Sequence, residues 1–391
     1  MAENATVTLS RVNTPPAQTW NYLRANDITL EVPFVSRKGD VYFALPRLFE
    51  GIECGMGQQV TSWIESQATD ATYVEVRAGE KREEPIVVTS MDTGVMVRAG
   101  AEATVVVCAS MTKGALDSSS ADSDGPHSAA EPANAHESAE PASSRQLDTS
   151  AALVRIIAEH DARVHVLEFV AADDEVQHIE SVGITADARA RVDVRQYFLG
   201  AGTTAAGLTC SLDGSSARFD LACRYLGRED ERLDINHVVR MHGRNGRTNV
   251  TESGVLDGRS RKALRATIDL VHGSSGSEGT ELENVLILSD DVTNKTMPVI
   301  LCDEDDVAGN HGATIGSVGP EQIRYLADRG LTEAEAEALY VRALFDEALI
   351  AAPTADVRAV VLERAKAVLG EDIANDLVEG LELDAIAHEE E

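Results

Sequence analysis

The sequence has few aromatic residues and no closely paired cysteines. Aromatic side chains make up 4% of its 391 residues, whereas hydrophobic residues as a whole make up 43%. The chain is long enough to bury a sizeable core, and that core must therefore be built mainly from Val, Ile, Leu and Ala. The five cysteines are scattered and form no Cys-x-x-Cys pair. An odd number at such spacing argues against a disulfide framework.

Positive charge and long apolar runs are scarce as well. The 34 Lys and Arg residues face 66 Asp and Glu residues, which gives a formal net charge of −32. Binding to nucleic acid or to an anionic membrane needs clustered Lys and Arg, so we expect neither. The N-terminus shows no basic region followed by an apolar run, and no stretch reaches the length of a bilayer span. We expect a cytoplasmic chain whose partners are proteins or small ligands.

What the sequence does contain is strand after strand. Period-two and β-branched runs begin near residue 31, continue to 108 and resume from 151 to 301, with almost no helical periodicity between them. The absence of interleaved helices excludes a doubly wound α/β sheet and leaves a sandwich, a barrel or a solenoid. Turn signals such as 212–216, 226–230, 242–246 and 256–260 recur at intervals of roughly 14 residues, which favours a β-solenoid.

Two segments do not fit the strand pattern. Residues 1–30 form a polar N-terminal arm whose Trp20, Tyr22 and Leu23 we expect to dock on the core, with a short partner-binding segment as the alternative. Residues 112–149 are rich in Ala, Ser, Glu, Asp and Pro and contain hardly an aliphatic side chain. Such a composition predicts a disordered acidic insertion in a loop. A flexible docking tether is the functional alternative.

Helical signals replace the strands after residue 319, so we divide the chain into an arm (1–30), a β-solenoid core (31–319) and a C-terminal helical module with an acidic tail (320–391). Pro320 and Gly330 frame a first helix, and Thr332 with Glu335 forms a capping box for a second. Thr354 starts a third helix. The module could cap the end of the solenoid or dock another subunit, and the sequence leaves these two roles about even.

His311 is the chemically most suggestive position. It stands between the last strand pattern and the first helix, after Asp303, Glu304, Asp305 and Asp306 and before small residues. A neutral imidazole there could bind iron or zinc. The simpler alternative is a histidine that hydrogen-bonds a nearby Asp and closes a turn. No second His or Cys stands at metal-ligand spacing, which weakens the case for a self-contained site.

These motifs resemble those of the SufB/SufD family of iron–sulfur cluster assembly scaffolds, and the SufD branch most closely. The resemblance is strongest over residues 240–350. It is carried by Gly254-Val-Leu-Asp-Gly-Arg-Ser, Asn284-Val-Leu-Ile-Leu-Ser-Asp, Asn294-Lys-Thr-Met-Pro, Asp305-Asp-Val-Ala-Gly-Asn-His-Gly-Ala-Thr-Ile-Gly and Glu321-Gln-Ile-Arg-Tyr-Leu-Ala-Asp-Arg-Gly-Leu. It implies a mainly β fold, a right-handed parallel β-helix with a C-terminal α-helical module, and a scaffold rather than an enzyme.

The resemblance also implies partners. A SufD-like chain pairs with a SufB-like subunit through its β-helix and docks a SufC-like ATPase on its C-terminal helices. Their partner-binding residues would be Tyr325, Leu326, Leu339, Tyr340, Leu344 and Phe345. His311 would be a ligand of a nascent, transient iron–sulfur cluster shared with a partner cysteine. A reduced flavin is suggested for such complexes, and the sequence does not show whether one binds.

One residue departs from the family pattern. Gly309 stands two residues before His311, where family members commonly carry a cysteine, so we expect this chain to supply an imidazole and no thiolate. Cys302 lies at an apolar strand position and is expected in the core. Two alternatives remain. One is a SufB-like paralogue, and the other is a β-helix enzyme acting on acidic polysaccharide with Arg240, Arg244 or Arg247 as base.

Overall fold

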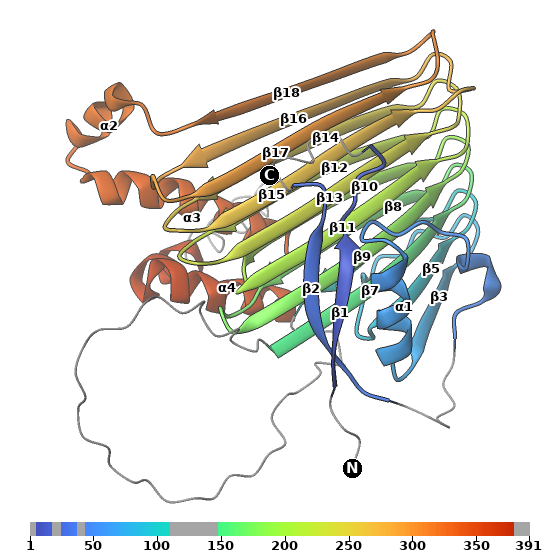
Figure 1. Ribbon diagram of the computed structural model, residues 1–391, viewed down its shortest axis with the longest axis horizontal. Coiled ribbons are helices and arrows are strands. Elements are labelled where there is room, and N and C mark those ends of the chain that lie inside the picture. Colours follow the sequence, from blue (N-terminus) through green and yellow to red (C-terminus); the bar gives the residue numbers. More distant parts are fainter. Residues whose placement is uncertain (1–4, 18–24, 37–43, 110–147, 379–391) are drawn as a thin grey trace, which may run out of the picture.

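The computed structural model describes residues 5–17, 25–36, 44–109 and 148–378 (Figure 1). Two eight-stranded parallel sheets dominate these ranges, and successive strands alternate between the sheets. The even-numbered sheet comprises β4 (Ile86–Val87), β6 (Glu102–Cys108), β8 (Arg163–Ala171), β10 (Arg191–Gly200), β12 (Arg218–Gly227), β14 (Arg247–Leu256), β16 (Glu278–Ile287) and β18 (Ala308–Gly316). The odd-numbered sheet comprises β3 (Ala71–Val76), β5 (Asp92–Val97), β7 (Asp148–Ala158), β9 (Val176–Ala186), β11 (Thr203–Leu212), β13 (Arg232–Met241), β15 (Arg261–Leu270) and β17 (Thr293–Cys302).

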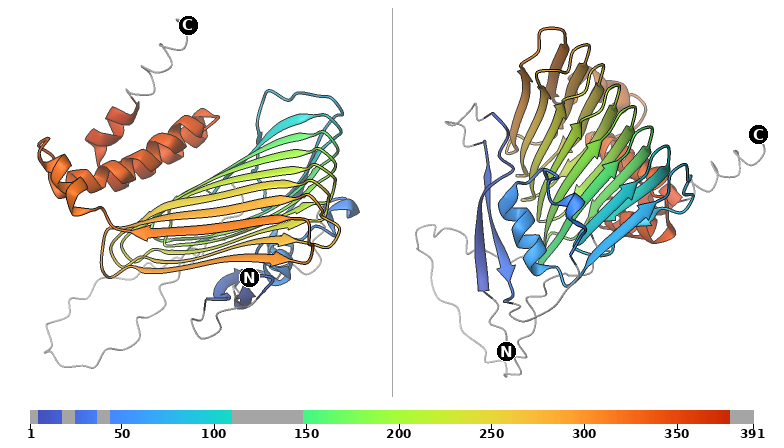
Figure 2. Two further views of the ribbon diagram at one scale, coloured as in Figure 1. Left: turned by 90° about the horizontal axis from the view of Figure 1, so that it is seen from above. Right: turned by 90° about the vertical axis from the view of Figure 1, so that its right-hand side faces the viewer.

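This alternation makes the chain a solenoid. Each strand pairs in parallel with the strand two places later, so Arg218 on β12 lies beside Arg247 on β14, one full coil further along the chain. The stacked coils are visible in both views of Figure 2. The prediction of a mainly β solenoid followed by helices is confirmed, and the sandwich and the barrel are ruled out as its architecture.

The space between the sheets is filled by small and branched aliphatic side chains. Val105, Val166, Val194 and Ile184 belong to this interior cluster and are buried. Because the strands pair in register, equivalent inward residues of neighbouring coils stack on one another. An interior built from Val, Ile, Leu and Ala is what the low aromatic content predicted.

The outer face of the odd-numbered sheet is covered by the N-terminal part of the chain. β1 (Ala5–Val12) and β2 (Ile28–Phe34) form an antiparallel pair, and η2 (Arg47–Phe49) and α1 (Gln58–Gln67) follow. Their apolar side chains pack on outward residues of β7, β9 and β11. Asn13 also donates to the Asp234 carboxylate at 2.8 Å. The segment expected to be an arm thus contributes a strand. Trp20, Tyr22 and Leu23 lie outside the described residues, as does most of the predicted insertion 112–149.

The helix α1 was not predicted. We expected almost no helix between residues 31 and 108, and this expectation is wrong. Val60, Trp63, Ile64 and Gln67 are the buried residues of α1. Their spacing of three, one and three residues is that of one helical face.

The C-terminal helices cover the other flank. α2 (Pro320–Ala327), α3 (Glu333–Ala351) and α4 (Ala355–Leu369) are followed by helical residues 371–378. Thr332 caps α3 through the predicted box with Glu335. α3 and α4 contact β8, β10 and β12, with Phe345 and Val361 in one apolar cluster with Phe169 and Tyr197. They therefore lie along the side of the solenoid and not across its last coil (Figures 1 and 2). Within the described ranges no helix has the length and apolarity to cross a membrane.

Candidate functional site

The last coil of the solenoid is open. Among the residues that the structure describes, β17 pairs with β15 alone and β18 with β16 alone, so each is an edge strand of its sheet. Eight of the nine residues of β18 are exposed and the ninth, Gly312, is half-buried. Edge strands present unpaired backbone groups that template pairing with another chain. We call the surface formed by β17 and β18 the open end.

His311 lies on β18, at the open end. It pairs in register with Glu281 of β16. Glu281 alternates with exposed residues and is 2% exposed, so it points into the solenoid. Because in-register residues of parallel strands share a face, His311 points to the interior side as well. No further coil of the described ranges covers His311, so its imidazole lies exposed next to the buried Glu281.

Gly309, two residues before His311, lies on the same inward face. A Cβ added at Gly309 would lie 2.9 Å from Cγ2 of Ile300 and 3.4 Å from Cδ1 of Leu270. The interior is thus already filled by aliphatic side chains of the opposite sheet at this position. A cysteine there would require Ile300 to move, which gives the departure from the family pattern a packing reason.

Behind the open end the interior is polar. Glu283 of β16 forms a buried ion pair with Lys262 of β15 and accepts a hydrogen bond from the Tyr225 hydroxyl at 2.7 Å. One coil further in, Glu252 and Nδ1 of His237 are 2.7 Å apart. Burial and the neighbouring Glu283 raise the pKa of Glu252 to about 8, and burial lowers the pKa of His237 to about 4.

Glu281 lies beside Glu252 in this polar interior. Both of its carboxylate oxygens are buried, and its side chain interacts with that of Glu252. Burial and the adjacent Glu252 raise its pKa to about 9, so the side chain is a neutral acid at pH 7.

The helical module presents a second exposed surface. Tyr325 of α2 is 56% exposed, and Leu339 and Tyr340 of α3 are 43% and 36% exposed. Tyr325, the half-buried Leu326 and Tyr340 line a cavity of about 290 Å³ between α2 and α3. The Arg329 guanidinium lies over the Tyr325 ring, 3.6 Å from its centroid. Aromatic residues held this way at a surface are typical of protein interfaces.

The comparison with protein families matches residues 125–344, more than half of the chain, to the domain described as SUF system FeS cluster assembly, SufBD core domain. The chain belongs to the SufBD family. Membership in this family, predicted from the motifs around His311, is thereby confirmed.

Curated relatives of this SufBD protein share about a quarter of its residues over the aligned parts. The iron-sulfur cluster assembly protein SufD of Bacillus subtilis is 28% identical over 140 residues, 36% of this chain and 32% of the relative. A SufBD family protein of Mycobacterium bovis is 27% identical over 192 residues, 49% of this chain and 23% of the relative. One of Pyrococcus horikoshii is 25% identical over 228 residues, 50% of each. The chain therefore spans between about a quarter and a half of these relatives.

Two predictions about the SufBD site need correction. Cys302 was expected in the core but is exposed, and its thiol donates to the Glu304 carbonyl at 3.3 Å. It stacks on the buried Leu270, and no later coil in the described part of the chain covers it. Leu344 and Phe345 were expected to bind a partner, but they are 8% and 0% exposed and hold α3 on the even-numbered sheet. Both residues are therefore committed to contacts within the chain.

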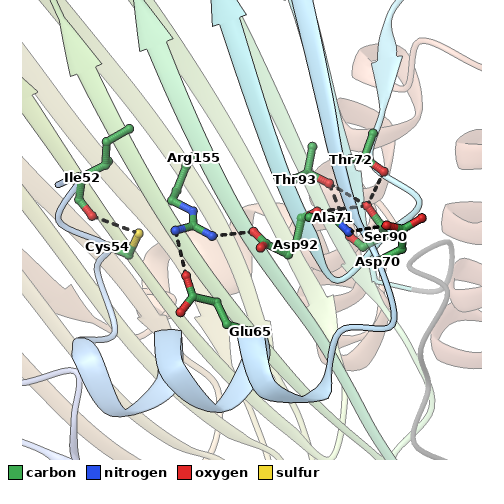
Figure 3. Close-up of polar contacts among 10 residues, drawn as sticks. All are labelled: Ile52, Cys54, Glu65, Asp70, Ala71, Thr72, Ser90, Asp92, Thr93 and Arg155. Atoms are coloured by element: carbon green, nitrogen blue, oxygen red, sulfur yellow. Dashed lines mark hydrogen bonds and ion pairs between the residues drawn. The ribbon is translucent and has the colours of Figure 1, made fainter. Parts of the chain in front are cut away.

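A further polar cluster lies away from the open end of the SufBD solenoid (Figure 3). Arg155 on β7 donates to Glu65 of α1 at 2.9 Å and to Asp92 of β5 at 2.7 Å. It borders a cavity of about 520 Å³ that Cys54 and Arg240 also line. Burial raises the pKa of Cys54 to about 12, so this thiol is protonated at neutral pH and is a poor nucleophile. We assign the cluster the structural role of joining α1 to the sheet.

The same cavity bears on the polysaccharide hypothesis. Arg240, one base considered for such an enzyme, donates to both Glu53 carboxylate oxygens at 2.7 and 2.8 Å and to Asp269 at 2.7 Å. A guanidinium held by two carboxylates stays protonated and cannot accept a proton.

Glu281 and the polar interior were missed by the sequence analysis. Their signal is a Glu at alternate positions 281 and 283 of a strand, where aliphatic residues are expected.

Proposed function

We propose that this chain is a non-catalytic, SufD-like scaffold subunit of a SufBCD-type complex. Its open end would pair with the β-helix of a SufB-like subunit, and His311 would hold a nascent cluster together with a cysteine of that subunit. The observation that carries the proposal is the open end, where two edge strands are each paired on one side and β18 presents an exposed, inward-facing imidazole. An uncovered solenoid end is a liability unless a partner covers it.

We favour a SufD-like over a SufB-like subunit because of where the cysteines of this chain lie. In this chain Cys54, Cys108, Cys210 and Cys223 are buried, and β18 contains no cysteine. The open end therefore offers an imidazole on β18 and one exposed thiol, that of Cys302 at the end of β17, so at least the cysteine expected on β18 and the remaining thiolate ligands of a cluster would come from the partner. The alternative of a SufB-like paralogue would need a cluster cysteine on β18.

The helical module suits an ATPase dock. Tyr325, Leu326, Leu339 and Tyr340 are the predicted contact residues that the chain itself does not bury. Arg364 of α4 forms an ion pair with Glu231, and Arg224 of β12 forms one with Glu347 of α3. Because α3 and α4 are fixed to the sheet in this way, movement of an ATPase on the module would move the solenoid with it. ATP-driven closure would then shift the two packed solenoids and open the His311 site to iron and sulfide.

The central test is His311→Ala in the complex reconstituted with SufB-like and SufC-like subunits. We expect the complex to assemble and cluster formation, followed by visible absorption and Mössbauer spectroscopy, to fall at least tenfold. The matched control is His165→Ala, because that histidine lies half-buried on the outer face of β8, away from the open end. Normal cluster yield in His311→Ala would overturn the proposed role of the open end.

The dock is tested with Tyr340→Ala in a pull-down of the tagged chain. We expect the ATPase to be lost while the SufB-like subunit is retained, and Tyr73→Ala, a tyrosine 38% exposed on β3, to keep both. Removing residues 320–391 would be a poorer test, since it would uncover Phe169 and Tyr197. Retention of the ATPase by Tyr340→Ala would place the dock elsewhere.

The binding of a reduced flavin and residence in the cytoplasm remain predictions from the resemblance and the sequence.

A further inference from the structure

One charged side chain of the helical module is buried against the edge of the solenoid. Arg364 of α4 is 8% exposed. Its Nη2 donates to Glu231 at 2.5 Å and its Nη1 to Asp174 at 3.2 Å. Its Nε donates to the Leu199 carbonyl at 3.3 Å. A guanidinium group carries five N–H donors in a fixed fork, so this one side chain holds three acceptors at defined positions.

The acceptors of Arg364 belong to three successive coils. Asp174 follows β8, Leu199 lies near the end of β10 and Glu231 follows β12, and these three strands are neighbours in the even-numbered sheet. Gly200 provides the space for the guanidinium group, because a Cβ added there would lie 2.2 Å from Nη2 of Arg364. We call Asp174, Leu199, Gly200 and Glu231 the arginine socket.

Neighbouring contacts define the position of the module less sharply. The apolar contacts of α3 and α4 with the sheet are not directional. Glu347, the partner of Arg224, is 40% exposed, so that ion pair contributes little. Glu231, by contrast, is 4% exposed. A buried ion pair adds little net stability over an apolar pair of similar size, but it disfavours every arrangement that leaves one charge unpaired. The arginine socket therefore fixes where α4 lies on the coils.

We propose that Arg364 is a positioning residue that transmits movement of the helical module to the solenoid. The inference rests on the proposed function, which supplies an ATPase as the source of movement. Withdrawing the guanidinium group from the arginine socket would leave Glu231 buried without this cation, at a cost in free energy. The socket would therefore follow α4 when the helix moves. Because the socket joins three coils, the displacement acts on all three together.

Two backbone amides report on this edge of the solenoid. Ala172 donates to the Gly200 carbonyl at 2.9 Å. Arg232 donates to the Gly202 carbonyl at 3.2 Å. Each bond joins adjacent coils, so its amide hydrogen exchanges with solvent when the coils separate. In the isolated full-length chain, Arg364→Met should raise the exchange rate of both amides at least about threefold, while the amides inside α4 stay protected. Mass spectrometry after deuterium labelling measures both.

The decisive measurement is made in the complex reconstituted with SufB-like and SufC-like subunits. In the wild type, ATP should change the exchange rate of the two amides. In Arg364→Met that change should be lost, although the ATPase still binds and hydrolyses ATP, which a residue with a merely structural role would not explain. Lys366→Met is the matched control, because Lys366 also lies on α4 and pairs with Glu363 of the same helix. It should respond to ATP as the wild type does.

The outcomes separate this inference from the proposed function. If the isolated Arg364→Met chain exchanges as the wild type does, the socket does not hold the coils and the inference fails. If the ATP-dependent change survives in the Arg364→Met complex, movement travels by another route and the inference also fails. Should Arg364→Met not fold, Arg364→Lys and Glu231→Gln are measured instead, and wild-type behaviour of both would overturn the inference. Failure of the proposed function would appear earlier, as a wild-type chain that retains no ATPase in the pull-down.

Discussion

The middle coils and the last coil of the solenoid follow the same pattern but have different surroundings. On β14, Val250 and Glu252 point inward and are 1% and 0% exposed. On β18, the inward Ile315 is 51% exposed, although it pairs in register with the buried Val285. The two strands differ in that β14 lies between two coils, whereas no later coil of the described residues stacks on β18. The comparison teaches that the alternation of a strand decides which side a residue faces, whereas the end of the stack decides whether it can meet a ligand.

The two flanks sharpen this comparison. The N-terminal strands and α1 cover the odd-numbered sheet, and α3 and α4 cover the even-numbered sheet. Both flanks are thus covered by the chain's own elements, whereas at the open end β17 and β18 are edge strands to which a partner can add strands.

The largest difference should appear when a large inward side chain is truncated in the two kinds of coil. Phe219 on β12 is 0% exposed, so Phe219→Ala should lower the free energy of unfolding by about 3–5 kcal/mol through lost burial and a cavity. Ile315→Ala on the last coil should cost less than about 1 kcal/mol in the isolated chain. Chemical denaturation measures both, and equal losses would contradict the comparison.

A smaller effect is expected from the polar interior. Lys262 and Glu283 are both fully buried, and Lys262→Met would leave Glu283 without its cation. We expect a loss of roughly 3 kcal/mol, at the low end for a broken buried ion pair, because the Tyr225 hydroxyl still donates to Glu283. The double variant Lys262→Met with Glu283→Gln should recover most of the loss. A double variant no more stable than Lys262→Met would argue against the ion pair as the cause.

The smallest effect is a change in the pH dependence of stability. The pKa of Glu252 is raised from 4.5 to about 8 in the folded chain, so the folded state holds this proton more tightly than the unfolded state. Its contribution to stability is complete below about pH 4.5 and is lost as the pH rises through 8. Glu252→Gln should therefore flatten the decline in stability over this range.

His237, whose pKa is lowered from 6.5 to about 4, contributes little to the slope toward the upper end of this range. Glu231 and Glu281, whose pKa values are raised to about 7 and about 9, also contribute to the slope, so the difference between the wild type and Glu252→Gln is what reports on Glu252. Thermal unfolding between pH 6.5 and 8 is the measurement, with Glu278→Gln on the outer face as control. An unchanged slope in Glu252→Gln would show that this carboxyl group does not set the pH dependence.

Local patterns predicted much of this structure. The solenoid follows from alternating aliphatic residues separated by regular turns, and the capping box at Thr332 places the start of α3. The short helix α1 was missed because one buried face of four residues is a weak signal inside a strand-rich region. The assignment of Leu344 and Phe345 to a partner failed for another reason: an apolar helix face indicates that something covers it, but not whether the cover is the chain's own sheet.

The candidate site divides in the same way. The sequence by itself determined that the chain is a β-solenoid with a helical module, and that His311 lies where the strands end, because alternation, turns and caps depend on neighbours in the chain. Only the tertiary structure decided that Glu281 stacks beneath His311, that Cys302 is exposed and that the helices lie along the flank. These depend on the register between strands a full coil apart and on the place where the stacking stops, which local sequence does not encode.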